Sequence, residues 1–218
     1  MKEIRHGQLQ LISFLWLRRG IGLAGIVLPI FLIAGTYLVG NEECKTIQSA
    51  ISDYYHTIVR DIFVGVLAVL AIFLFSYKGP EKIDNIAANL AGLFALGIAY
   101  FPTSIKTCNQ WNGYENPVMH NISAVSFFLV LTYFSLFLFP KTSSLDPPTP
   151  EKLKRNKIYK TCGIIMLISI IIVGIQMTFL EKVSPFDSFP IILIFEWVAL
   201  WAFGISWIVK GELFLEDK

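Results

Sequence analysis

The sequence is poor in charged residues. Only 16% of its 218 residues are charged and the formal net charge is +2, whereas soluble domains carry about 25% charged residues. A net charge this small creates no general attraction for a phosphate backbone. These shortages exclude a disordered chain, a nucleic-acid-binding protein and an ordinary soluble enzyme.

Cysteine and histidine are also scarce, with three residues of each. No Cys-x-x-Cys pair is present, so the sequence has no signature of a zinc finger, a covalent haem or an iron–sulfur cluster. Cys44 and Cys108 fall between apolar segments. Two alternatives stay open for them: a disulfide in an oxidising compartment, or two free thiols.

Hydrophobic residues are abundant instead, at 55% of the chain, with a mean hydropathy of +0.61. A helix needs about 20 mostly apolar residues to cross a bilayer core of roughly 30 Å. Six segments qualify, and because lipid forces backbone groups to pair internally, all six should be helices. We therefore expect one all-α, polytopic membrane domain, a bundle of six transmembrane helices. The predicted spans are residues 21–39, 62–77, 86–101, 122–139, 163–180 and 191–209.

Lysine and arginine are distributed unevenly about these spans. Fourteen of the 18 fall on the side that holds both termini, and four fall on the other side: Lys45, Arg60, Lys106 and Lys182. Basic residues favour the cytoplasmic side. We therefore predict that both termini are cytoplasmic and that residues 40–61, 102–121 and 181–190 face outward.

Two cytoplasmic segments are distinctive. Residues 1–19 read either as an amphipathic segment on the membrane surface or as an extension of the first span. Residues 140–162 form a predicted proline-rich, basic loop, in which residues 151–160 could be helical. Its basic residues fit either ordinary positive-inside topology or contact with anionic lipid headgroups.

Ionisable residues at membrane depth are costly and need an explanation. The run 52–61 leads directly into the second span. If this run is helical, Asp53, His56 and Arg60 share one face, while Tyr54 and Asp61 share another.

Two further polar groups lie at the outer ends of later spans. His120 and Ser123 are three residues apart at the start of the fourth span, and Glu196 follows Pro190 by six residues in the sixth. At roughly 1.5 Å per residue, Glu196 lies about 9 Å along that helix.

Spans two, four and six all begin on the outer side, so their polar groups could meet. We predict an outward-opening polar pocket, a default site for ligands in a helix bundle. The alternative is structural, with ion pairs joining helix ends and aromatic residues lying at the lipid headgroups. The predicted pocket residues are Tyr54, His56, Arg60, Asp61, His120, Ser123 and Glu196.

Ser52-x-x-x-His56 followed by Asp61 resembles part of the signature of the ceramidase and progestin-receptor-like superfamily of membrane hydrolases. That family binds zinc, has seven spans and carries a His-x-x-x-His pair, which is absent here. The resemblance covers about ten residues. It implies a zinc-dependent hydrolase, which in this chain would have to use His56, His120 and Asp61 as its three metal ligands.

A longer stretch, Tyr-Tyr-His-Thr followed by Arg-Asp-Ile-Phe-Val-Gly and Phe-Leu-Phe-Ser-Tyr-Lys-Gly, is similar to uncharacterised bacterial multi-span membrane proteins. This resemblance implies the same topology and a bacterial inner (plasma) membrane. It implies no activity.

Three functions compete at this stage. The first is binding of a lipid or small molecule in the outer pocket, with membrane lipids as partners and no nucleic acid. The second is metal-dependent lipid hydrolysis, with Glu196, Asp61 and Ser123 as candidate catalytic residues and a metal-activated water. The third is proton-coupled transport of a small molecule through Asp61 and Glu196. The sequence does not determine the oligomeric state.

Overall fold

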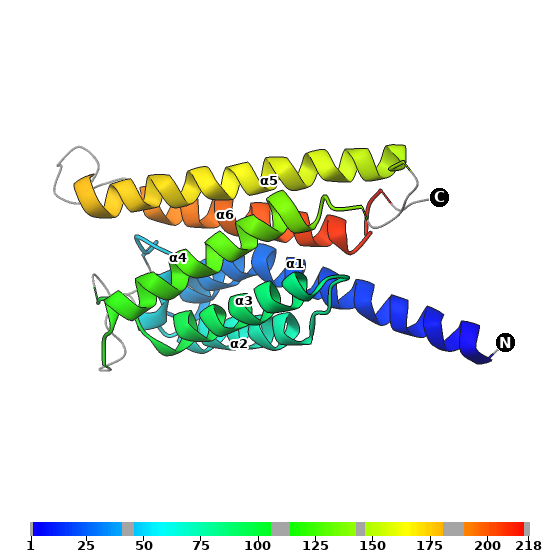
Figure 1. Cartoon of the computed structure of the whole chain (residues 1–218). Helices are drawn as coiled ribbons and strands as arrows, with labels where there is room; N and C mark the ends of the chain where they lie inside the picture. Colours follow the sequence, from blue (N-terminus) through cyan, green and yellow to red (C-terminus); the bar gives the residue numbers. More distant parts are fainter. Residues whose placement is uncertain (1, 41–45, 106–113, 143–146, 181–189, 216–218) are drawn as a thin grey trace.

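The computed structural model describes residues 2–40, 46–105, 114–142, 147–180 and 190–215, with side chains described from residue 13 onward except at residue 180. Within these ranges the chain is mostly helical and contains no strand (Figure 1). A short 3₁₀ helix, η1 (Ser52–His56), precedes the second long helix, and two π-helical segments, η2 (Phe134–Leu138) and η3 (Gln176–Leu180), extend the fourth and fifth. The long helices are α1 (Lys2–Val39), α2 (Arg60–Ser76), α3 (Lys82–Tyr100), α4 (Pro117–Tyr133), α5 (Pro150–Ile175) and α6 (Ile191–Lys210).

Within the described residues, five helical segments are long and apolar enough to cross a membrane. They are Ser13–Val39, Lys82–Tyr100, Pro117–Leu138, Pro150–Phe179 and Ile191–Lys210. The remaining long helix, α2, has 17 residues and is somewhat shorter than these five. The predicted all-α fold is therefore confirmed, with several helices suited to span a membrane. The number of crossing helices and the cytoplasmic placement of the termini stay predictions.

The six helices form a closed ring. Each packs on the helix before and after it in the chain, and α6 packs back on α1. Both termini lie at the same end of the bundle (Figure 1). We call this the terminal end, and the other the opposite end.

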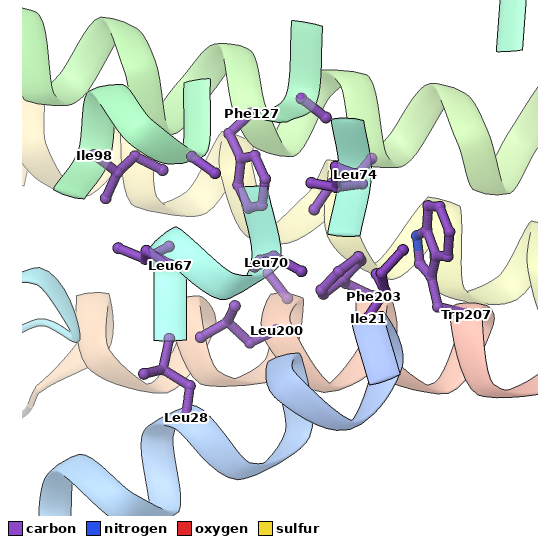
Figure 2. Packing of buried hydrophobic residues seen from close by; sticks show 14 of the residues in the cluster. Ile21, Leu28, Leu67, Leu70, Leu74, Ile98, Phe127, Leu200, Phe203 and Trp207 are labelled. Carbon is purple, nitrogen blue, oxygen red and sulfur yellow. The ribbon is translucent and has the colours of Figure 1, made fainter. Parts of the chain in front are cut away.

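The interior of the ring is filled by large apolar side chains from several helices (Figure 2). Leu70, Leu74, Phe127, Phe203 and Trp207 are all buried. Burial of each such side chain contributes about 1.5–3 kcal/mol in water. In lipid the gain comes from close packing instead, because the surrounding tails are equally apolar.

The outside of the ring is also apolar. Ile72, Leu93 and Ile171 are 61%, 57% and 52% exposed. A large exposed apolar surface on a helix bundle marks a surface made for an apolar surrounding. Together with the apolar helices, it supports an integral membrane protein.

The ring is closed by two facing glycines. A methyl group at Gly22 of α1 would lie 2.6 Å from the Gly204 carbonyl oxygen of α6, and one at Gly204 would lie 2.6 Å from the Gly22 oxygen. Small residues of this kind let two helix backbones approach closely. The α1–α6 contact therefore depends on the absence of side chains at these two positions.

At the terminal end, α1 extends well beyond the first predicted span. Residues 2–19 form one continuous helix with the first span. Arg19 of this helix donates hydrogen bonds to the carbonyl oxygens of Gly211 (2.8 Å) and Glu212 (3.2 Å), just after α6. Cationic side chains commonly satisfy the free carbonyls at the end of a helix.

Within the predicted segment 140–162, the residues that could be helical are helical, and the helix begins at Pro150. The α5 helix begins there, with Thr149 as its N-cap accepting a hydrogen bond from the Lys152 amide at 3.0 Å. A threonine N-cap followed by proline in the first turn is a favourable start for a helix. Most of the basic residues assigned to the loop therefore lie on a helix. Cys44 and Cys108 lie outside the described residues.

Candidate functional site

A cavity of about 100 Å³ lies at the opposite end of the bundle. Its walls come from the first half of α4, the last turns of α5 and the first half of α6. Ala50, Ser52, Asp53 and Thr103 also contribute. Two of the seven predicted pocket residues, His120 and Glu196, line it. We refer to this cavity as the outer pocket.

The outer pocket exists because α4 and α5 are close at one end and open at the other. A methyl group at Gly163, near the terminal end of α5, would lie 2.5 Å from Leu136. At Gly174, three turns further along, nothing lies within 4 Å. Figure 1 shows α4 crossing the bundle obliquely, with its first turn turned away from α5. Gly174 lines the resulting space.

Asp53 is the buried acidic group of the outer pocket. It is 4% exposed. One carboxylate oxygen, Oδ2, accepts a hydrogen bond from the Ser49 hydroxyl at 2.5 Å. The other, Oδ1, is buried and has no hydrogen-bond partner within the described part of the chain. A buried polar atom without a partner costs about 1–3 kcal/mol, so it is a place where a ligand donor would be stabilising.

Glu196 joins the outer pocket to the connection between α1 and α2. Its Oε2 accepts a hydrogen bond from the Ile51 backbone amide at 2.6 Å. Close by, the Leu193 amide donates to the Ser49 carbonyl at 3.0 Å. These two bonds dock residues 49–53 on the first turns of α6 and thereby place Asp53 at the pocket.

Both buried histidines hold the connection between α3 and α4. His56 Nε2 lies 2.7 Å from the Thr103 carbonyl oxygen, and His120 Nδ1 lies 2.7 Å from that of Phe101. Because a carbonyl oxygen only accepts, each of these nitrogens carries the proton. A neutral His120 therefore has Nε2 as a hydrogen-bond acceptor, and His120 lines the outer pocket.

The run 52–61 is not the single helix expected from its spacing, and this displaces Asp61 and Arg60. The 3₁₀ helix η1 ends at His56, and Thr57 is extended (φ −103°, ψ 174°) before α2 begins at Arg60. The Thr57 hydroxyl donates to the Tyr54 carbonyl at 2.8 Å, a local bond that competes with a continuous helix.

Asp61 consequently does not line the outer pocket. Its side chain is 95% exposed and lies 3.5 Å from the Arg60 guanidinium. Arg60 stacks on the Tyr55 ring, 4.8 Å from its centre, and donates to the Tyr55 hydroxyl at 3.1 Å. These contacts fit the structural alternative for this pair, an exposed ion pair near the start of a helix.

Tyr54 and Ser123 are buried but do not line the outer pocket. The Tyr54 hydroxyl accepts a hydrogen bond from the Gln48 amide at 3.4 Å, and burial raises the pKa of this tyrosine. The Ser123 hydroxyl donates to the Met119 carbonyl at 2.8 Å and packs against Gly97 of α3. Ser123 thus serves the α3–α4 contact, and its catalytic role stays a prediction.

The predicted zinc ligands His56, His120 and Asp61 do not fit a metal. Within the described residues, no three side chains of histidine, cysteine, aspartate or glutamate lie close enough to hold an ion. Each histidine uses one nitrogen on a backbone carbonyl, and the Asp61 side chain is exposed. These three side chains therefore do not form the metal site that the hydrolase interpretation requires.

The structure adds Ser52, Asp53, Thr103, Asn121 and Ser169 to the predicted set. Asp53 stands in the same polar run as Asp61, so the sequence contained the right segment. Which of Asp53 and Asp61 reaches the pocket depends on the helix break at Thr57. No proline or helix-capping signal in the sequence indicates this break.

No protein-family model matches the chain, and neither the curated proteins nor the solved structures contain a significant match. The two resemblances noted from the sequence therefore remain expectations, and the function has to be argued from the site itself.

Proposed function

We propose that this integral membrane protein binds an amphiphilic ligand, a lipid or small molecule, in the outer pocket. The ligand's polar end would reach Asp53, His120 and Glu196. Its apolar part would lie along Phe128 and Val173, which line the same space. The observation that carries the proposal is the buried, unpartnered Asp53 Oδ1 at a cavity whose side wall is apolar.

The polar groups favour a ligand that donates hydrogen bonds. Asp53 and Glu196 are carboxylates, which accept when ionised, and neutral His120 offers its Nε2 as an acceptor. An amine or hydroxyl headgroup matches this set, whereas a carboxylate or phosphate would be repelled. A volume of about 100 Å³ holds one small headgroup, so the rest of the ligand must extend between α4 and α5.

The other two functions have no specific observation in their favour. The hydrolase interpretation required His56, His120 and Asp61 as metal ligands, and of these only His120 lines the pocket. The transport interpretation required Asp61 and Glu196 as a pair of carboxylates, and Asp61 is exposed. Ligand binding needs only the residues that the pocket contains.

The test uses Gly174, which has open space where a side chain would go. Gly174→Leu should fill the pocket entrance without a clash. Gly65 of α2 also has nothing within 4 Å and does not line the pocket, so Gly65→Leu is the matched control. The probes are dodecylamine and monododecanoyl glycerol, with dodecanoate as the anionic comparison, each added to protein in phosphatidylcholine nanodiscs.

We expect at least one donor-headed probe to raise the melting temperature of the unmodified protein and of Gly65→Leu, with dodecanoate having little effect. Gly174→Leu should keep its own melting temperature but lose the shift. Equal shifts in both variants, or no shift with either donor-headed probe in the unmodified protein, would contradict the proposal.

A further inference from the structure

A second cavity, of about 910 Å³, lies at the terminal end of the bundle. We call it the basic cavity. Its walls come from α1, the α2–α3 turn, the start of α5 and the end of α6. This volume is in the range of pockets that hold drug-sized molecules, about 300–1,000 Å³.

The basic cavity has an excess of positive charge. Three acidic residues line it, and two of them are already engaged. Glu81 pairs with Lys141 at 2.7 Å, and buried Asp84 accepts the Glu81 amide at 2.9 Å as part of the helix cap of α3. Glu212 is the third. Six basic residues line the cavity: Arg18, Lys78, Lys141, Lys152, Arg155 and Lys210.

Two of these cations, Arg18 and Lys210, contact neutral groups. Arg18 donates to the Lys210 carbonyl at a long 3.4 Å, and its buried Nε has no hydrogen-bond partner among the described residues. The Lys210 ammonium lies 5.4 Å from the centre of the Phe139 ring. Among the described residues, no carboxylate forms a salt bridge with Arg18 or Lys210.

Like charges act on one another across the cavity. The charges that act on Lys210 include the cations Lys152, Arg18 and Arg155, opposed by Asp84. Half-buried cations that repel one another are costly, and an anion between them would remove that cost. Arginine and lysine together are the side chains that hold phosphate groups in proteins.

We infer that the basic cavity binds a ligand that carries phosphate groups, either a soluble phosphorylated molecule or the headgroup of an anionic lipid. Positive-inside topology alone does not explain the arrangement. Lys154, Lys157 and Lys160 on α5 are exposed and outside the cavity, and they would serve topology equally well. The inference is independent of the outer pocket, which lies at the opposite end.

The test compares two double variants of equal charge. Lys78→Gln with Lys210→Gln removes two cations from the basic cavity, and Lys154→Gln with Lys157→Gln removes two exposed ones. The soluble probe is inorganic tripolyphosphate, titrated calorimetrically into detergent-solubilised protein. The lipid probe is phosphatidylglycerol in phosphatidylcholine nanodiscs, with retained lipid counted by native mass spectrometry. Melting temperatures check that each variant is folded.

We expect the cavity variant to bind the relevant probe about tenfold more weakly or worse, because it lacks two cations that would contact the phosphate groups. The exposed variant should bind as the unmodified protein does. Tripolyphosphate binding identifies a soluble source, and retention of phosphatidylglycerol without tripolyphosphate binding identifies a lipid. No binding of either probe, or equal losses in both double variants, would overturn the inference. If the cavity variant fails to fold, Lys78→Gln alone, in an exposed turn, replaces it.

Discussion

The Glu196 carboxylate accepts a hydrogen bond from the Ile51 amide at 2.6 Å, across 145 residues of chain. It therefore ties α6 to the connection between α1 and α2 and has a structural role besides any contact with a ligand. Substitutions can separate these two roles. The hydrogen bond from the Ile51 amide needs only an acceptor oxygen, whereas attraction of a cationic ligand needs the negative charge.

Glu196→Gln should change the free energy of unfolding by less than about 1 kcal/mol, since the glutamine oxygen still accepts from the Ile51 amide. Glu196→Ala should cost about 1–3 kcal/mol, because that amide loses its partner. Reversible denaturation in detergent measures both. Under the proposed function, Glu196→Gln should also weaken dodecylamine binding more than monododecanoyl glycerol binding. A large loss of stability in Glu196→Gln would show that the charge itself holds the fold.

The glycine contact between α1 and α6 should be intolerant of a single methyl group. Gly204→Ala places that group 2.6 Å from the Gly22 oxygen, a backbone atom that cannot rotate away. We expect a loss of about 1–3 kcal/mol, as for other overpacked sites. Gly174→Ala, in open space, should be neutral or stabilising by up to about 1 kcal/mol. Because Gly22→Ala breaks the same contact, its effect combined with Gly204→Ala should be less than the sum.

His120→Ala should lower stability without altering metal content. The substitution removes the donor to the Phe101 carbonyl, which costs about 1–3 kcal/mol. Elemental mass spectrometry of the purified protein should give the same substoichiometric zinc for His120→Ala and for the unmodified chain. Stoichiometric zinc that disappears in His120→Ala would instead revive a metal site.

Tyr54 should make the protein sensitive to alkaline pH. Burial raises its pKa above the usual 10.0, so the folded state favours the neutral phenol. That contribution to stability is complete below about pH 10 and is lost as pH rises through the folded-state pKa. Melting temperatures from about pH 8 to about pH 11 should therefore fall more steeply for the unmodified protein than for Tyr54→Phe. Parallel curves would show that Tyr54 does not contribute.

The helices themselves were predictable because long apolar runs leave few alternatives in lipid. Each predicted span overlaps one helix, and the last, 191–209, differs from α6 (Ile191–Lys210) by one residue. The largest difference is at α1, which begins 19 residues before the predicted span. The next largest is at α5, which begins 13 residues before the predicted span. Its basic first turns contain no apolar run, so hydropathy could not include them.

The site was less predictable because it depends on contacts between distant segments. His120 and Glu196 were found because each is a polar residue in an apolar helix. Asp53 was passed over for Asp61, since regular helical spacing does not reveal a break that comes from the Thr57 hydroxyl bonding to the Tyr54 carbonyl. The opening between α4 and α5 was equally hidden, because it depends on how two helices cross.

The closed ring also has a consequence for how the protein is made. The ribosome releases α1 first, and α2 to α5 follow before its partner α6. Until α6 is made, the surface of α1 around Gly22 must face lipid or a chaperone, because the helix that covers it in the folded protein is still missing. Assembly of helices after their insertion is the usual course in membranes. Here α1, the first helix made, waits longest for its contact with α6. A chain stopped before Gly204 should therefore be recognised and degraded as an incomplete ring.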